Sequence, residues 1–321
     1  MKSIFMFCIL CVFFLLPLHC ANADMGQVLV SDAQVSESAQ KAIILHNGSE
    51  EVLILGTDLL ADTKVGILRF IPFPSEPQVK LAPDGVFETV SGLLATHGIS
   101  FLMATKGGAP QAQAVELLVQ EKLGAHDMTV IKVNNATQFR SWVNDYFKSH
   151  NLPAKETYSS VETIVDDYVQ RGIPYFVLDY VELSDQPRFI EPVCYRFASH
   201  DLYYPLKTSN TFGGQGEIDL ILFLPGTLCK PSLGAYDTCL GFTNYVDNGR
   251  ASTSAQVSHD ELRSIYPEAE EFFGERPVFL QMFSYAGDYT FDRDILEEIG
   301  GAAPMALGLE TEPVYGLFPP D

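Results

Sequence analysis

Three histidines in this chain are each followed directly by an aspartate, which places an imidazole beside a carboxylate. The dipeptides are His126-Asp127, His200-Asp201 and His259-Asp260. Imidazole nitrogens and carboxylate oxygens are both ligands for zinc and copper. The first two dipeptides lie in turns between predicted strands. If these turns meet at one sheet edge, His126, Asp127, His200 and Asp201 are candidate metal ligands or the site of a hydrolytic enzyme.

An ordinary structural role for the same dipeptides stays open. Adjacent residues on a strand point to opposite faces, so a histidine and the next aspartate would not converge there. The chain contains no helical His-x-x-x-His pair, Gly-x-Ser-x-Gly elbow, Walker loop or EF-hand loop. Gly213, Gly214 and Gly216 precede a predicted strand, whereas phosphate loops precede a helix. The sequence therefore predicts no cofactor and leaves the catalytic residues open.

The N-terminal segment has the pattern of an export signal. Lys2 precedes an apolar run from Ile4 to Leu16, and Ala21-Asn22-Ala23 supplies the small residues that a signal peptidase requires. We therefore expect cleavage after Ala23 and a mature protein in the periplasm or outside the cell. An uncleaved N-terminal membrane anchor and a lipoprotein acylated at Cys20 are the alternatives.

Three cysteines remain after this cleavage. Cys229 and Cys239 lie ten residues apart around a loop that can bring them together, so we predict a disulfide between them. Cys194 lies in a predicted strand, which favours a buried inert thiol. Two alternatives stay open for it: a thiol–imidazole pair with His200, and a redox or metal-handling role.

Charge and composition exclude some partners. Removing residues 1–23 leaves 19 basic and 41 acidic residues, a net charge of about −22. A field of that sign repels nucleic-acid phosphates and anionic membrane surfaces, so neither is an expected partner. Hydrophobic residues make up 47% of the chain, which is enough for a large core. We expect a protein or a small-molecule ligand as the partner.

Hydrophobic periodicity predicts strands and three amphipathic helices in the first part of the chain. Asn47-Gly48 is a strong hairpin signal, and a helix is expected to begin near Asp84. Asn135 is expected to cap the next helix, and a third begins at Ser159 with Glu162 as its capping partner. The strands expected in this part are 41–45, 51–55, 65–71, 115–121 and 128–133.

The rest of the chain continues without regular alternation of strands and helices. Short helices are expected from Ser258 and over 292–299, and strands at 174–181, 193–198, 203–208, 218–224 and 277–283. This order predicts an α+β fold of mainly antiparallel sheets with amphipathic helices packed on them. Residues 24–321 are expected to form a single unit. The linker-like stretch 105–113 marks the boundary if that unit has two lobes.

Five short motifs follow one another along the chain. They are Phe70-Ile71-Pro72-Phe73-Pro74-Ser75, the stretch Glu121 to Ile131, Phe139-Arg140-Ser141-Trp142, the stretch Tyr168 to Phe176, and Arg196-Phe197-Ala198-Ser199 with Leu202 to Lys207. In this order they resemble a family of secreted bacterial proteins of unknown function, over roughly residues 39–225. The resemblance implies bacterial export and this fold, and it implies no reaction.

The sequence therefore indicates a soluble, exported α+β protein that is a non-catalytic binding or envelope-associated module. Aromatic residues near prolines, at 70–73, 203–204 and 285–291, are either its binding surface or part of its core. The alternative functions are a metal-dependent or hydrolytic enzyme with its site near His126 and His200, and a metal-handling or redox protein.

Mass spectrometry of the exported protein tests the leader and the disulfide together. We expect the mature N-terminus at Asp24 and, without reduction, a peptide pair linked through Cys229 and Cys239. A loop this short stabilises the fold by roughly 2–3 kcal/mol in the chain-entropy account, so reduction should lower the unfolding midpoint. A free thiol at Cys229, or Met1 retained on a cytosolic protein, contradicts these predictions.

Overall fold

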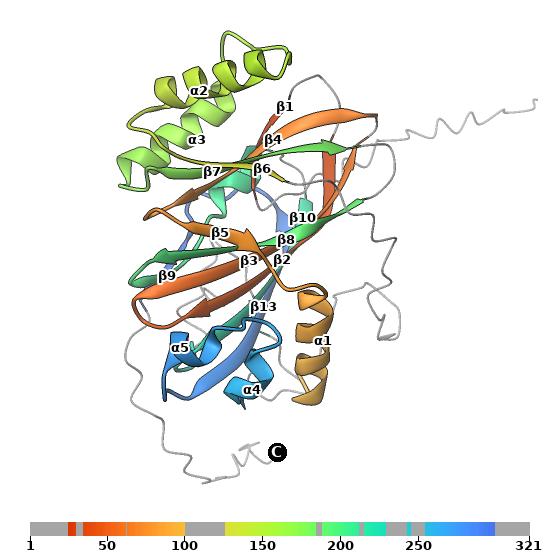
Figure 1. Cartoon of the computed structure of the whole chain (residues 1–321), viewed down its shortest axis with the longest axis vertical. Coiled ribbons are helices and arrows are strands. Elements are labelled where there is room, and N and C mark those ends of the chain that lie inside the picture. Colours follow the sequence, from red (N-terminus) through yellow and green to blue (C-terminus); the bar gives the residue numbers. More distant parts are fainter. Residues whose placement is uncertain are drawn as a thin grey trace, which may run out of the picture.

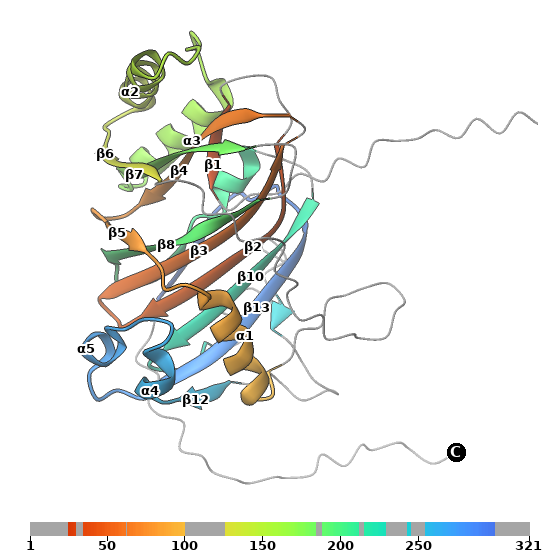
Figure 2. The same cartoon turned by 45° about the vertical axis from the view of Figure 1, so that its right-hand side comes forward.

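Helices and strands of this protein stack in four layers (Figures 1 and 2). The computed structural model describes residues 25–29, 35–61, 63–99, 126–183, 188–211, 215–228, 243–244 and 254–298. In these residues a pair of helices, a smaller sheet, a larger sheet and a second group of helices follow one another. The predicted α+β fold with mainly antiparallel sheets is confirmed.

The smaller sheet has four antiparallel strands in the order β1-β4-β7-β6. They are β1 (Gly26–Leu29), β4 (Val65–Phe73), β7 (Tyr175–Leu183) and β6 (Asp127–Lys132). The two central strands pair along their whole length, from Val65 opposite Leu183 to Phe73 opposite Tyr175. Among the described strands β6 pairs only with β7, so it is an edge strand of this sheet.

The larger sheet has the order β11-β13-β10-β2-β3-β8-β5, and β12 also pairs with β13. All its strand pairs are antiparallel except β10 with β2, which is parallel. Its strands are β2 (Val35–His46), β3 (Glu50–Ala61), β5 (Gln78–Leu81), β8 (Arg188–Ala198), β10 (Gln215–Leu224), β11 (Thr243–Asn244), β12 (Ala255–Val257) and β13 (Val278–Asp288).

The predicted hairpin at Asn47-Gly48 connects β2 to β3. Gly48 has a φ of 92°, a conformation that glycine adopts without a steric penalty. The Asn47 side-chain oxygen accepts hydrogen bonds from the backbone N–H groups of Ser49 and Glu50. Local turn chemistry therefore sets the register of the two longest strands in the larger sheet.

Two groups of helices cover the outer faces of the sheets (Figure 1). The smaller sheet carries α2 (Ala136–Ser149) and α3 (Ser159–Gln170), and the larger sheet carries α1 (Val86–Thr96), α4 (His259–Leu262) and α5 (Ala269–Phe273). The predicted Asn135 cap of α2 is confirmed, because its side chain accepts from Gln138 N–H. The N-cap of α3 is Tyr158, whose N–H donates to Glu162.

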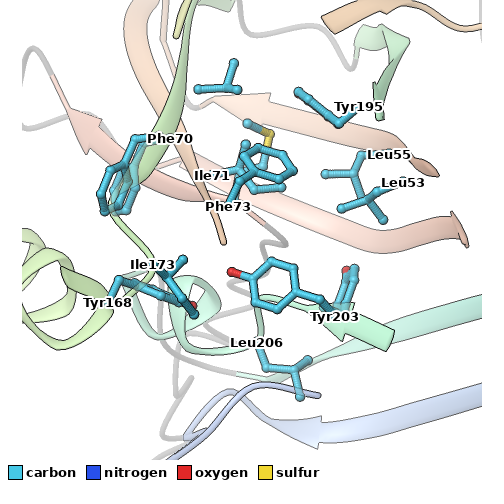
Figure 3. Packing of buried hydrophobic residues seen from close by; sticks show 14 of the residues in the cluster. Leu53, Leu55, Phe70, Ile71, Phe73, Tyr168, Ile173, Tyr195, Tyr203 and Leu206 are labelled. Atoms are coloured by element: carbon cyan, nitrogen blue, oxygen red, sulfur yellow. The ribbon is translucent and has the colours of Figure 1, made fainter. Parts of the chain in front are cut away.

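A hydrophobic cluster lies on each face of the larger sheet, because successive side chains of a strand point to opposite sides. Ile44 belongs to the face that packs against the smaller sheet, and Ile43 belongs to the face that packs against α1, α4 and α5. Phe73 of β4 bridges the sheets: its ring centroid lies 5.1 Å from that of Tyr195 and 4.9 Å from that of Phe197 (Figure 3).

The aromatic segments near prolines are mostly core. Phe70, Phe73, Tyr203, Tyr204 and Phe291 are all buried. In Figure 3, Phe70, Phe73 and Tyr203 lie among the packed side chains of the cluster on the face of the larger sheet that packs against the smaller sheet. Of the two roles that the sequence left open for these segments, the structure assigns the core role, and the binding surface has to be sought elsewhere.

Two expectations about the later elements are wrong. The helix expected over 292–299 is a strand, β14 (Ile295–Glu298), which pairs with β9 (Asp201–Tyr204). Pairing with a distant strand outweighs the weak helical periodicity of so short a segment. The strand expected over 203–208 ends at Tyr204, because Pro205 cannot donate to a ladder, and a 3-10 helix follows over Lys207–Thr211.

Several predicted features lie outside the described residues. They are the leader 1–23, the linker 105–113, the strand 115–121 and the disulfide between Cys229 and Cys239. Cys194 is described and is buried, as expected for an inert thiol. Burial raises its pKa to about 12, so the reactive thiolate is disfavoured. No helix in the described ranges is long and apolar enough to cross a bilayer.

Candidate functional site

Arg69, Asp179 and His126 form a buried charged cluster between the two sheets. Arg69 and Asp179 are directly opposite each other on β4 and β7. Arg69 is four residues from Phe73 on one strand, so both face the larger sheet. Arg69 Nη2 donates to Asp179 Oδ2, and His126 Nδ1 lies 3.1 and 3.3 Å from the two carboxylate oxygens. The side chains are at most 4% exposed.

The two partners of Asp179 explain why a carboxylate is tolerated in this interior. Burial by itself would raise the pKa of Asp179, but the Arg69 charge and the His126 hydrogen bond outweigh it and hold the pKa below its usual value. The Asp179 carboxylate is therefore ionised at neutral pH, with Arg69 as its counter-charge. His126 Nε2 is also buried, and it has no hydrogen-bond partner among the described residues.

The neighbouring residue Asp127 points to the opposite face of the smaller sheet, toward α2. It accepts a hydrogen bond of 2.5 Å from the Tyr146 hydroxyl and lies 3.5 Å from His150 Nε2. Its side chain is 50% exposed. The predicted dipeptide His126-Asp127 therefore contributes to two separate networks, one inside the protein and one at its surface, as strand alternation requires.

Two rings of α2 and the ring of its C-cap residue His150 stack in a column beside Asp127. Tyr146 lies between Trp142 and His150, with centroid distances of 5.3 and 4.1 Å and interplanar angles of 16° and 25°. These residues are four apart and so recur on one helix face. We name Trp142, Tyr146, His150 and Asp127 the α2 aromatic surface. Its side chains are half-buried or exposed.

Tyr146 acts as a hydrogen-bond donor on this surface. Burial raises the pKa of Tyr146, and the hydrogen bond and charge of Asp127 raise it further, so the hydroxyl keeps its proton. Trp142 and Tyr146 recur at helical spacing with Phe139, Val143 and Phe147 and form one apolar stripe along α2. The structure divides that stripe: the last three are fully buried, whereas Trp142 and Tyr146 lie at its margin.

The second predicted dipeptide lies in a different part of the fold. His200 and Asp201 lie where β8 ends and β9 begins, and Ser199 N–H before them donates to the carbonyl of Ser49 in the β2–β3 turn. His259 is the first residue of α4. Across the described ranges, no group of three or more His, Cys, Asp or Glu side chains is placed to hold a metal ion.

Sequence reasoning missed a buried pair of titratable residues beside the β2–β3 turn, at the end of the larger sheet where β8 ends before His200. His46 and Glu51 are opposite each other on β2 and β3, and both are fully buried. His46 Nδ1 accepts from Gly48 N–H, and Glu51 Oε2 accepts from Tyr203 N–H, both at 2.8 Å. Burial lowers the pKa of His46 to about 4 and raises that of Glu51 well above its usual value. Both side chains therefore favour their neutral forms.

A model of the bacterial family DUF2330, described as an uncharacterized protein conserved in bacteria, matches residues 19–226. The chain belongs to the DUF2330 family. The resemblance to a bacterial family of unknown function is confirmed by this match. The matched range includes the buried charged cluster and the α2 aromatic surface, so both lie in the part of the chain that defines the DUF2330 family.

Similarity to proteins outside the DUF2330 family is distant. No protein among the curated sequences matches this chain. The crystal structure of baculovirus P35 aligns with a TM-score of 0.45 and 8% identity, over 84% of this chain and 98% of that one. A mutated baculovirus P35 after caspase cleavage aligns with a TM-score of 0.41 and 8% identity, over 82% and 100%. Nothing about function follows from either alignment.

The Arg69→Met variant tests the buried ion pair. It leaves the Asp179 carboxylate without its counter-charge, so we expect a loss of about 3–5 kcal/mol in the free energy of unfolding, measured by urea denaturation. The double variant Arg69→Met with Asp179→Leu should recover most of this loss, because no charge is then left unpaired. A single variant that loses less than about 1 kcal/mol contradicts the assignment.

The Glu51→Gln variant tests whether Glu51 is buried in its protonated form. Because the folded-state pKa is raised, Glu51 contributes its full stability below the unfolded value of 4.5 and loses it as the pH rises. This loss is at most about 1.4 kcal/mol per pH unit, and glutamine cannot ionise. Denaturation series should therefore show the variant gaining stability over the wild type between about pH 4 and 8. The exposed Glu275→Gln control should show no such gain.

Proposed function

We propose that this chain is an exported, non-catalytic binding module that contacts its ligand through the α2 aromatic surface. The observation that carries the proposal is the column of Trp142, Tyr146 and His150, which leaves aromatic rings at the surface beside the Asp127 carboxyl group. Rings that combine a large apolar face with a polar group are enriched where proteins bind partners. The export signal and the acidic charge favour a partner in the cell envelope that is neither nucleic acid nor anionic lipid.

The base of this surface is closely packed, which favours binding without large rearrangement. The Phe139 ring, on the buried side of α2, meets Phe70 of β4 and Phe176 of β7 edge-on, at centroid distances of 5.4 and 5.6 Å. A helix held by such contacts presents its outer side chains in one arrangement, so little entropy is lost when a ligand binds. The ring centroid of Tyr180 of β7 lies 6.1 Å from that of Tyr146, so Tyr180 extends the aromatic area toward the sheet.

Capture from an envelope extract tests this proposal. The immobilised mature protein should retain a defined component, and Trp142→Ala or Tyr146→Ala should weaken that retention at least tenfold, as expected for truncation of a central aromatic contact. Leu296→Ala is the matched control, because Leu296 is 54% exposed and lies on β14. Capture that is equal in all variants, or absent from the wild type, contradicts the proposal.

One observation favours a second candidate, an acid–base enzyme. The His126 imidazole has one nitrogen against the Asp179 carboxylate and the other without a partner in the described residues, which is how an aspartate orients a catalytic histidine. A screen of ester, amide and phosphoester substrates tests this candidate. Turnover that His126→Gln abolishes would favour an enzyme over a binding module.

A further inference from the structure

The interior and surface networks meet at two consecutive residues. His126 directly precedes β6 and reaches inward to Asp179, whereas Asp127 is the first residue of β6 and reaches outward to Tyr146. Consecutive Cα atoms are only about 3.8 Å apart. A change in the position of His126 is therefore transmitted to Asp127 through a single peptide unit.

The charges around His126 make its position sensitive to a proton. The described charged groups that face it are Asp179 from β7 and Arg69 from β4, and Asp127 follows it along the chain. The negative charge of Asp179 is already balanced by Arg69. Protonated His126 would therefore add an uncompensated positive charge to a site in which every side chain is at most 4% exposed. Such a charge is costly to keep buried.

The two networks also influence each other electrostatically. Burial and the Asp127 hydrogen bond are the largest causes that raise the pKa of Tyr146, and the charge of Asp179 adds to them from the other side of the sheet. A change in charge at the buried cluster is therefore felt at the hydroxyl that binds Asp127. The α2 aromatic surface is coupled to the interior by charge as well as by the backbone.

We propose that His126 is a proton-controlled switch of the α2 aromatic surface. Neutral His126 stays inward against Asp179 and holds Asp127 beside Tyr146. Protonated His126 leaves the cluster toward solvent, and this movement draws Asp127 away from the Tyr146 hydroxyl. As a control on ligand binding the switch rests on the proposed function, but the movement itself can be measured without any ligand.

The fluorescence of Trp142 reports this movement directly. Trp142 is the only tryptophan of the chain and stacks on Tyr146, so its emission responds when Tyr146 loses its hydrogen bond. We expect one transition in the emission of the ligand-free mature protein in the range where histidines exchange protons, about pH 5 to 8. His126→Gln should abolish the transition. His150→Gln is the matched control, because His150 also stacks on Tyr146, and it should retain the transition.

Three results would overturn the switch: no transition in the wild type, a transition that persists in His126→Gln, or one that His150→Gln removes. If His126→Gln does not fold, Tyr146→Phe replaces it. That variant keeps the ring but loses the hydroxyl that binds Asp127, so the emission change should fall at least twofold, and an undiminished change overturns the proposal.

Capture from the envelope extract at about pH 5 and pH 8 separates this inference from the proposed function. We expect retention about tenfold weaker at the lower pH in the wild type, and no pH dependence in His126→Gln. A His126-dependent emission change without any captured component supports the switch and contradicts only the proposed function. Capture that is equal at both pH values, without an emission change, overturns the switch and leaves the proposed function standing.

Discussion

The burial of the central strands of the smaller sheet on both faces is the constraint on which the rest of the structure depends. Helices α2 and α3 cover one face and the larger sheet covers the other, so nearly all of β4 and most of β7 are shielded from water. A polar group on the buried part of these strands must find its partner inside the protein. Arg69 pairs with Asp179 for this reason, and the Tyr203 hydroxyl donates to the carbonyl of Pro72. Specific pairing in an apolar interior disfavours alternative strand registers.

The edge strand β6 is where this interior meets the surface. Strand alternation sends His126 to the buried cluster and Asp127 to α2, so neighbouring residues experience very different surroundings. The same alternation explains why His126 and Asp127 do not act as a pair. An aspartate next to a histidine in sequence is turned away from it on a strand, and the partner of His126 comes from β7, 53 residues further along the chain.

Local chemistry could be read from the sequence, and long-range pairing could not. The Asn47-Gly48 turn and the Asn135 cap depend on residues within three positions of one another, so their signals are complete in the sequence. The partnership of Arg69 with Asp179 spans 110 positions. Its only trace was that Arg69 is the one charged residue of the apolar strand β4 and that Asp179 lies at the centre of the apolar strand β7. The strand β14 was predicted as a helix because its partner, β9, is also distant along the chain.

The C-terminal part of the chain, beyond the range matched by the family, contacts the larger sheet and helix α3, which lie next to the elements of the site. β13 pairs with β10 from Gln215 to Leu224 and so extends the larger sheet on which the smaller one rests. Asp294 accepts a hydrogen bond from Tyr168 of α3 and pairs with Arg171 after it, both at 2.8 Å. These contacts hold α3, which packs against α2 through an ion pair of Arg140 with Glu162. The α2 aromatic surface thus depends on residues near the C-terminal end of the described chain, and a fragment that stopped at the family boundary would lack the Asp294 contacts to α3.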